Sequence, residues 1–359
     1  MAQGQTTATL KIQANEPGVQ ISSNLFGIFF EEINFAGEGG LYAEMVRNRS
    51  LDNSSNPDYW TLVTQGSAVG QMSVDTSLPL KANNTHSLKL TMTGGSGTVG
   101  AANSGFWGMD LQQGTEYDLS FYVNGGAGGF PGPVSARLES ADGTQVYAQT
   151  SFHGITNGWQ KFTASLIPNE TDTNAQLVLG IAQSGTVWLD VISLFPHATF
   201  HNRPKGMRAD VANMLDAMHP SFMRFPGGNY VEGNTLADAF RWKNTIGDIA
   251  TRPGHLNSAW GYWSTDGLGY LEYLELCKDL HCEPLFVVNC GLALGYNGST
   301  NNTVPLDQMG PWVQDALDAI QYANGETNTY WGARRAADGH PAPFHLKYVE
   351  IGNENGGSY

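Results

Sequence analysis

The sequence predicts an α/β protein, namely the first half of a (β/α)8 TIM barrel, with an all-β sandwich of the jelly-roll kind inserted after the first barrel strand. Three observations lead to this prediction. In the second half of the chain, apolar strand-like runs alternate with helical periodicity, which is typical of parallel strands joined by helical crossovers. Short β-prone runs separated by turn residues fill the middle of the chain. Polar residues follow the apolar runs of the α/β part, where barrel enzymes place their chemistry.

Length and composition favour more than one folded part. The chain has 359 residues, of which 41% are hydrophobic, so it can form more than one core. We divide it into 1–50, with the first barrel strand, 51–196, the sandwich, and 197–359, with barrel strands two to four. The net charge is −15, and the charged fraction is only 14%. A surface of this sign disfavours nucleic acid and anionic membranes as partners and suits a neutral ligand such as a sugar.

The sequence carries no clear targeting, membrane or metal-binding signal. The start, Met1 to Thr7, lacks the basic and apolar regions of a signal peptide, as in a secreted enzyme whose signal was replaced by an initiator Met, and also as in a cytoplasmic protein. We expect a secreted or periplasmic protein without a membrane span. Cys277, Cys282 and Cys290 have neither C-x-x-C spacing nor histidines at ligand spacing, so we expect free, mostly buried thiols and no metal site.

The first fifty residues are expected to contain the first barrel strand. Thr9–Ile12 alternates and predicts a short strand. Val19–Glu32 is a dense apolar run that ends in two carboxylates, as in a parallel strand buried on both faces. After a glycine-rich turn, Leu41–Arg47 predicts a short helix.

The middle of the chain predicts the sandwich. Its β-prone runs are Ser87–Met92, Tyr117–Val123, Ser135–Glu139, Trp159–Leu166, Gln176–Ile181 and Thr186–Leu194. The aromatic residues Trp107, Tyr122 and Trp159 have two interpretations. They form a platform on which a sugar stacks, or they belong to the sandwich core, and we favour the core.

The rest of the chain predicts helices and strands in alternation. Helices are expected at 208–218, 268–280 and 312–322, and strands at 221–225, 284–289 and 346–353. Four successive strands are followed by polar residues, namely Glu31, then Arg224 with Asn229, then Asn289, then Asn353 with Glu354. An open doubly wound sheet also produces this pattern, but no G-x-G-x-x-G follows the first strand, so the barrel is preferred. For Glu354 alone, a polar residue that merely ends an edge strand is an equally good interpretation.

At this point the sequence resembles a known family, the retaining α-L-arabinofuranosidases of glycoside hydrolase family 51. The matching segments are Gly27–Asn34, Gly39–Glu44, Met223–Tyr230, Arg252–His255, Trp260–Tyr262, Ser264–Gly269 and Glu350–Glu354. The resemblance covers both barrel segments and the inserted sandwich, which looks like the carbohydrate-binding module of the family's longer members. It implies that the substrate is an arabinose-containing polysaccharide or oligosaccharide and that no cofactor takes part.

The resemblance also implies roles for individual residues. Glu354 matches the family's general acid/base, and its neighbour Asn353 matches a residue that binds the 2-hydroxyl of the sugar. The residues that match the glycone pocket are Glu31, Arg224, Asn229 and Trp260. Structural alternatives remain open, because Arg224 also suits an ion pair with Glu350, and Asn229 also suits a turn after two glycines.

The implied chemistry sets requirements on the site. Retaining hydrolysis needs one carboxylic acid to protonate the leaving oxygen and a second carboxylate, about 5–5.5 Å away, to attack the anomeric carbon. Glu354 must hold a proton at working pH, so we expect burial or a neighbouring carboxylate to raise its pKa. Glu350 is a poor nucleophile candidate, because it lies four residues earlier, roughly 13 Å along an extended strand.

The family's nucleophile belongs to a later barrel strand, beyond Tyr359. We therefore expect the remainder of the barrel to come from a second polypeptide or from a missing C-terminal part, and the isolated chain to be inactive. Two other functions remain open. One is an endo-acting β-glucanase or xylanase on the same scaffold, and the other is a non-catalytic carbohydrate-binding protein.

Overall fold

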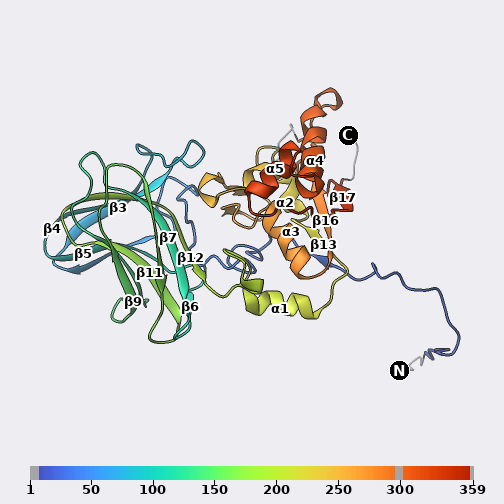
Figure 1. Cartoon of the computed structure of the whole chain (residues 1–359), viewed down its shortest axis with the longest axis horizontal. Coiled ribbons are helices and arrows are strands. Elements are labelled where there is room, and N and C mark those ends of the chain that lie inside the picture. Colours follow the sequence, from blue (N-terminus) through green and yellow to red (C-terminus); the bar gives the residue numbers. More distant parts are fainter. Residues whose placement is uncertain (1–7, 296–301, 356–359) are drawn as a thin grey trace, which may run out of the picture.

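Two parts lie side by side in the computed structural model of the chain, a β-sandwich and an α/β part (Figure 1). The structure describes residues 8–295 and 302–355. The sandwich consists of strands β2 to β12, whereas the α/β part consists of β1 and the elements that follow the sandwich. Within the described ranges, no helix is long and apolar enough to cross a membrane.

The sandwich has two antiparallel sheets, with strand orders β10-β7-β12-β4-β3 and β2-β5-β11-β8-β9, and β6 pairs with β11. Its strands are β2 (Thr61–Gly66), β3 (Val69–Asp75), β4 (Ser87–Gly94), β5 (Gly97–Asn103), β6 (Met109–Leu111), β7 (Tyr117–Asn124), β8 (Val134–Ser140), β9 (Val146–Phe152), β10 (Gln160–Leu166), β11 (Asp172–Ile181) and β12 (Gly185–Pro196). The six predicted runs are confirmed as β4, β7, β8, β10, β11 and β12. Strands such as β5 were not predicted, because glycine and alanine give a weak β signal.

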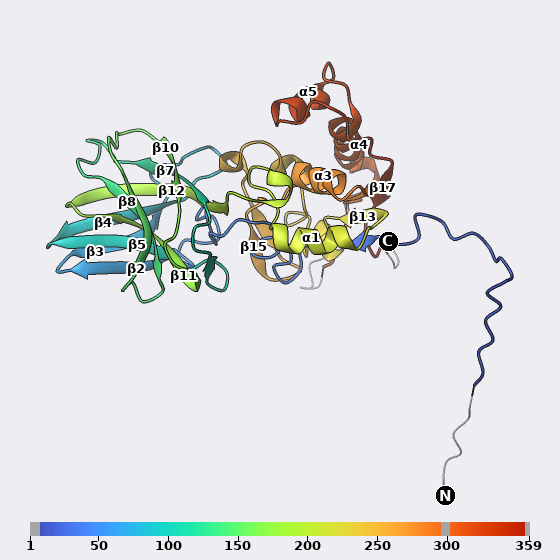
Figure 2. The ribbon, with the colours of Figure 1, turned by 60° about the horizontal axis from the view of Figure 1, so that its bottom comes forward.

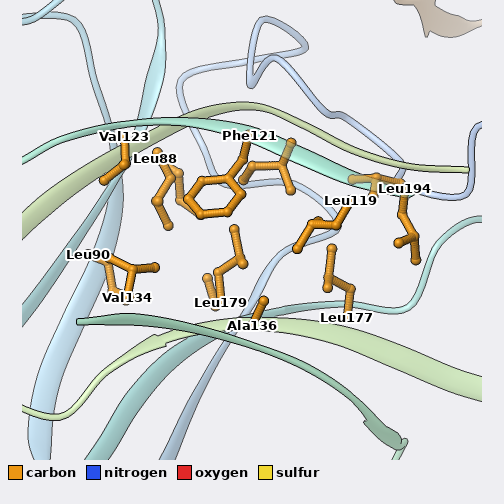
Figure 3. Packing of buried hydrophobic residues seen from close by; sticks show 14 of the residues in the cluster. Leu88, Leu90, Leu119, Phe121, Val123, Val134, Ala136, Leu177, Leu179 and Leu194 are labelled. Atoms are coloured by element: carbon orange, nitrogen blue, oxygen red, sulfur yellow. The ribbon is translucent and has the colours of Figure 1, made fainter. Parts of the chain in front are cut away.

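The core of the sandwich lies between its two sheets. Along β7, Leu119 and Phe121 are buried while Asp118 is exposed, as expected for a strand with one face in the core. Figure 3 shows Leu119 and Phe121 pointing toward Leu177 and Leu179 of the opposite sheet. Burial of these apolar faces is the main force that holds the two sheets together.

The α/β part contains a four-stranded parallel sheet in which the strands follow one another in sequence order. They are β1 (Ile28–Phe29), β13 (Phe222–Phe225), β16 (Glu283–Val288) and β17 (Tyr348–Ile351), and each pairs in parallel with the next. The strand order does not reverse, whereas an open doubly wound sheet reverses at its switch point. The predicted strands at 221–225, 284–289 and 346–353 are confirmed, although the last ends early, at Ile351.

Helices surround this sheet, and the three predicted ones are confirmed as α1 (Ala209–Ala217), α3 (Tyr270–Asp279) and α4 (Gly310–Asn324). The elements that were not predicted are α2 (Asn229–Glu232), α5 (Tyr330–Ala337), the hairpin β14 (His255–Asn257) with β15 (Tyr262–Ser264), and the 3₁₀ turns η1 (Phe200–Asn202), η2 (Trp242–Thr245), η3 (Ile249–Thr251) and η4 (Leu306–Gln308). Helix α5 is held by Arg335, which is fully buried and donates hydrogen bonds to carbonyl groups at the end of α4 and just after it, including those of Ala323 and Gly325. These bonds satisfy carbonyls that a helix end leaves free.

The predictions for the first residues of the chain are largely wrong. Thr9–Ile12 is not a strand, and in the Val19–Glu32 run only Ile28–Phe29 pairs with β13. Residues 8–27 are exposed, and most of this segment extends away from the body of the protein (Figure 2). Only its end contacts the sheet, where the carbonyl of Phe26 accepts from the backbone N–H of Ser221 over 2.9 Å. Apolar periodicity indicates burial only where a partner surface is present.

The helix predicted at Leu41–Arg47 is also wrong. Tyr42 forms a bridge with Met207, and the backbone N–H of Ala43 donates to the carbonyl of Gly206 over 3.1 Å. The N–H of Ala43 and the carbonyl of Leu41 therefore bond to the segment that leaves the sandwich instead of forming helical bonds. Tertiary pairing has replaced the local helical preference.

We expect a cavity in the sandwich core to lower the stability of the protein strongly. Leu179→Ala should lower the free energy of unfolding by about 2–5 kcal/mol, because Leu179 is fully buried between the sheets. The matched control is Leu62→Ala on β2, where the side chain is 38% exposed. Urea denaturation of both variants measures the difference, and equal losses would contradict the proposed packing.

Candidate active site at the carboxyl ends of the parallel strands

The polar residues predicted from the sequence meet at one edge of the parallel sheet. Glu31 follows β1, Asn229 follows β13, and Asn353 and Glu354 follow β17. Because these strands are parallel, their carboxyl ends lie at the same edge. Arg224 lies within β13 and extends toward β17, which makes it the centre of the cluster.

Arg224 joins β13 to β17. Its Nε donates to Glu350 over 2.6 Å, and its Nη2 donates to the same carboxylate over 2.7 Å and to Oδ1 of Asn353 over 2.9 Å. The hydrogen bond to Glu350 raises the pKa of Arg224, so the guanidinium remains charged. The ion pair with Glu350, which the sequence analysis left open as an alternative for Arg224, is present. Arg224 also contacts the predicted site residue Asn353.

Asn353 is buried, and three partners fix the orientation of its amide. Its Oδ1 accepts from Arg224, while its Nδ2 donates to Glu232 over 3.1 Å and to Oδ1 of Asn229 over 3.3 Å. An amide with a cation on one side and a carboxylate on the other has only one favourable orientation. The predicted residues Arg224, Asn229 and Asn353 thus form one connected network.

Glu232 belongs to this network but was missed by the sequence analysis. It is buried on α2, and burial raises its pKa above the ordinary value. The charges of Glu354 and Glu31 act in the same direction, whereas the hydrogen bond from Asn353 opposes the shift. One sequence signal could have indicated Glu232 as a site residue: it lies three residues after Asn229, about one helical turn further on.

Glu31 is held from two sides. Its Oε1 accepts from the backbone N–H of Tyr230 over 2.9 Å and from Nε1 of Trp260 over 3.2 Å. The turn after β13 contains Gly227 and Gly228, and a Cβ on Gly228 would lie 2.6 Å from a carboxylate oxygen of Glu31. The two glycines therefore make room for this carboxylate, and the structure brings Trp260 and Glu31 together as the sequence analysis expected.

Behind Glu31, a buried carboxyl group holds the hairpin that carries Trp260. Glu32 accepts hydrogen bonds from the hydroxyl of Tyr262 over 2.9 Å and from the backbone N–H of Glu38 over 3.0 Å. Asn257 donates to the carbonyl of Glu32 over 2.8 Å. Burial, together with the charge of Glu38, raises the pKa of Glu32 to about 8. The carboxyl group of Glu32 is therefore mostly protonated at neutral pH.

Glu354 lies beside the network and is exposed in the described part of the chain, so burial, one of the two alternatives expected for it, is not found there. Strand β17 ends at Ile351, and positive φ angles at Gly352 (78°) and Glu354 (40°) turn the backbone away from the extended path. The charge of Glu354 still acts on Arg224 and on Glu232. Its carboxylate makes no hydrogen bond or ion pair with the residues that the structure describes, so it is free to contact another molecule.

Of the three cysteines, Cys290 lies beside the site, because a Cβ on Gly352 would be 2.7 Å from its sulfur. Cys277 and Cys282 are buried, Cys290 is half-buried, and all three are free, as predicted.

Comparison of the chain with known proteins finds similar families and structures. Residues 214–359 match the model of the α-L-arabinofuranosidase 1 domain, and residues 43–185 match that of a carbohydrate-binding domain. The arabinose-bound MgGH51 α-L-arabinofuranosidase superimposes with a TM-score of 0.87 at 35% identity, over 95% of this chain and 55% of that one. The fold and the site thus define a relative of the glycoside hydrolases.

Curated relatives found by sequence are also named α-L-arabinofuranosidases. α-L-Arabinofuranosidase 2 of Arabidopsis thaliana is 37% identical over 99% of this chain and 53% of its own length. The extracellular exo-α-L-arabinofuranosidase of Streptomyces chartreusis is 32% identical over 98% of this chain and 43% of its own length. Over nearly its whole length, the chain is similar to α-L-arabinofuranosidases, including one of glycoside hydrolase family 51. It spans about half the length of the curated relatives that it matches.

The raised pKa of Glu32 predicts a pH-dependent stability. The pKa is about 8 in the folded protein against an ordinary value of 4.5, so the folded state binds this proton more tightly. The resulting stabilisation is fully present below pH 4.5 and is lost as the pH rises toward 8. Glu32→Gln should therefore gain stability relative to the unsubstituted protein over this range, by about 1.4 kcal/mol for each pKa unit at most.

Urea denaturation at several pH values measures this difference. The matched control is Glu170→Gln, at an exposed position of the sandwich. A constant difference between Glu32→Gln and the unsubstituted protein from pH 5 to pH 8 would contradict the prediction.

The close contact between Gly228 and Glu31 predicts a coupling between the two residues. Gly228→Ala should lower the free energy of unfolding by about 1–3 kcal/mol, because the added methyl group overlaps the carboxylate. In a Glu31→Ala background the same substitution should cost much less. A double-mutant cycle measures this coupling, and additive effects would show that Gly228 does not make room for Glu31.

Proposed function

We propose that the complete protein is a retaining glycoside hydrolase that releases terminal α-L-arabinofuranosyl residues from arabinan- or arabinoxylan-type hemicellulose. The observation that supports this proposal best is the network of Arg224, Asn229 and Asn353 beside Glu354, at the carboxyl ends of parallel strands. Similarity to known proteins supports it too, because the matched relatives are named α-L-arabinofuranosidases.

In this proposal Glu354 is the general acid/base. Its carboxylate has no partner among the described residues, so it can donate a proton to the leaving oxygen and later take one from water.

The remaining predicted residues bind the arabinofuranosyl group. Glu31, Arg224, Asn229 and Trp260 form the glycone pocket, and Asn353 contacts the 2-hydroxyl. The Asn353–Asn229 bond, at 3.3 Å, is the longest of the three made by the Asn353 amide, so a sugar hydroxyl would replace this one. The bonds to Arg224 and Glu232 would then keep the amide oriented while the sugar is bound.

The nucleophile is expected outside this chain. The neighbouring carboxylates are already engaged, Glu31 by Trp260, Glu232 by Asn353, and Glu350 by Arg224. The matched relatives are about twice as long. Among the described residues, the sheet also ends in two unpaired edges, β1 and β17, with exposed apolar side chains such as Ile351, at 74%.

A second half of the barrel would pair with both edges and cover these side chains. The remainder, from a second polypeptide or from a C-terminal part of the same one, would place its carboxylate about 5–5.5 Å from Glu354. We place the protein outside the cytoplasm, in line with the extracellular relative from Streptomyces chartreusis, whose name also favours exo action over the endo-glucanase alternative.

Glu354→Gln should lower kcat of the complete protein on an aryl α-L-arabinofuranoside by about 10²–10⁴-fold, because the amide cannot transfer a proton. The loss should be smaller for a substrate whose leaving group is a weaker base. Glu170→Gln, a charge-matched change at an exposed position of the sandwich, should leave kcat unchanged.

In the same assay, the 359-residue chain by itself should show no turnover. Activity of this chain that Glu354→Gln removes would place the nucleophile within these residues. Full activity of Glu354→Gln in the complete protein would exclude Glu354 as the general acid/base.

A further inference from the structure

A hollow of about 610 Å³ lies where the sandwich meets the α/β part, apart from the carboxylate network. Three segments and Thr173 of β11 line it; the segments are residues 39–45 before the sandwich, 106–117 within it, and 196–210 at its end and after it. None of the predicted site residues lines this hollow. Its volume falls within the range of small-molecule sites in proteins.

The lining of the hollow includes an exposed tryptophan, Trp107. Trp107 is 68% exposed, so the core interpretation that we favoured for it is wrong. Tyr122, by contrast, packs against Val191 and Ile249, which places it at the junction of the two parts instead of on a shared platform. A tryptophan this open in a hollow offers a flat apolar surface together with an indole N–H.

The aromatic residues behind Trp107 are held in place. Phe35 meets Trp107 edge to face, with ring centroids 5.6 Å apart, and Phe106 lies 6.0 Å from it. The guanidinium of Arg47 lies 4.8 Å from the centre of the Phe35 ring. Gly39 leaves room for Phe106, because a Cβ there would lie 2.5 Å from its ring. Trp107 is therefore supported by a fixed aromatic base.

Polar side chains surround this aromatic surface. Asp110 and Gln112 are exposed and hydrogen-bonded to each other over 2.7 Å, and Arg208 and Asp210 form an exposed ion pair across the hollow's lining. Such groups both donate and accept, as the hydroxyls of a sugar require. With a net charge of −15, the protein disfavours anionic ligands here.

The aromatic residues behind Trp107 also contact the hairpin beside the candidate active site. Phe35 stacks on Tyr262 of the hairpin strand β15, with ring centroids 4.0 Å apart and planes inclined by 22°. Tyr262 in turn holds Glu32, and the hairpin carries Trp260, which contacts Glu31. The hollow and the candidate active site are thus connected through one hairpin.

We propose that the hollow around Trp107 is a second carbohydrate-binding site, which holds a neutral pyranose chain of the polysaccharide substrate away from the arabinofuranosyl group that is cleaved. The flat C–H face of a pyranose ring would stack on Trp107, while its hydroxyls would bond to Gln112 and Arg208. The role of this second site in the reaction rests on the proposed function, whereas the binding of a sugar chain to the hollow does not.

The test is binding of xylohexaose, which contains no arabinofuranosyl group, measured by isothermal titration calorimetry on the complete protein. Trp107→Ala should weaken binding at least 10-fold, and Gln112→Ala should weaken it to a smaller degree. Tyr330→Ala on α5 is the matched control, because Tyr330 is an aromatic residue with 77% exposure remote from the hollow, and this variant should bind as the unsubstituted protein does. Hexagalacturonate should not bind.

Each outcome decides the proposal. Equal binding by Trp107→Ala and Tyr330→Ala, or no binding of xylohexaose to the unsubstituted protein, would overturn it. A lower Tm of Trp107→Ala with unchanged sugar binding would also overturn it, because Trp107 would then be a packing residue. Hydrolysis of an aryl α-L-arabinofuranoside by the unsubstituted protein is measured separately. Its absence beside Trp107-dependent binding would refute only the proposed activity.

Discussion

The contact between Arg224 and Glu350 is the interaction on which the candidate site depends. It joins two strands that are separated in the sheet by β16 and in sequence by 126 residues. The guanidinium has donors left for Asn353, whose amide then reaches Glu232 on α2. One planar cation thus aligns side chains from a strand, a loop and a helix, which a point charge such as lysine would not do.

Three glutamates in or near the candidate site have different surroundings. Glu350 is ion-paired, Glu32 is buried with a pKa of about 8, and Glu354 is exposed. A single residue type therefore occurs as a charge partner, as a neutral hydrogen-bonding group, and as an exposed side chain without a partner among the described residues. Burial and neighbouring charge, and not residue identity, decide which of these a given glutamate becomes.

The sandwich is attached firmly to the α/β part by the segment that enters it. Glu44 is buried and accepts hydrogen bonds from the hydroxyl of Ser193 over 2.6 Å and from the N–H of Leu194 over 2.9 Å, both on β12. Arg49, which is fully buried, lies 3.7 Å from the same carboxylate. The entry and exit of the insertion are thereby joined, which holds the hollow at Trp107 in a constant relation to the hairpin behind Glu31.

The sequence by itself determined the parts that depend on local pattern. Alternating apolar residues predicted six sandwich strands, and helical periodicity predicted α1, α3 and α4, because each pattern is set by neighbours a few residues away. The motifs around Arg224 and Asn353 named residues that the structure does bring together. Only the tertiary structure decided that Glu232 joins them, that Trp107 is open, and that 8–27 remains exposed. Each of these depends on what lies opposite a side chain in space, and residues far outside the local pattern determine that, such as Asn353 for Glu232, 121 positions away.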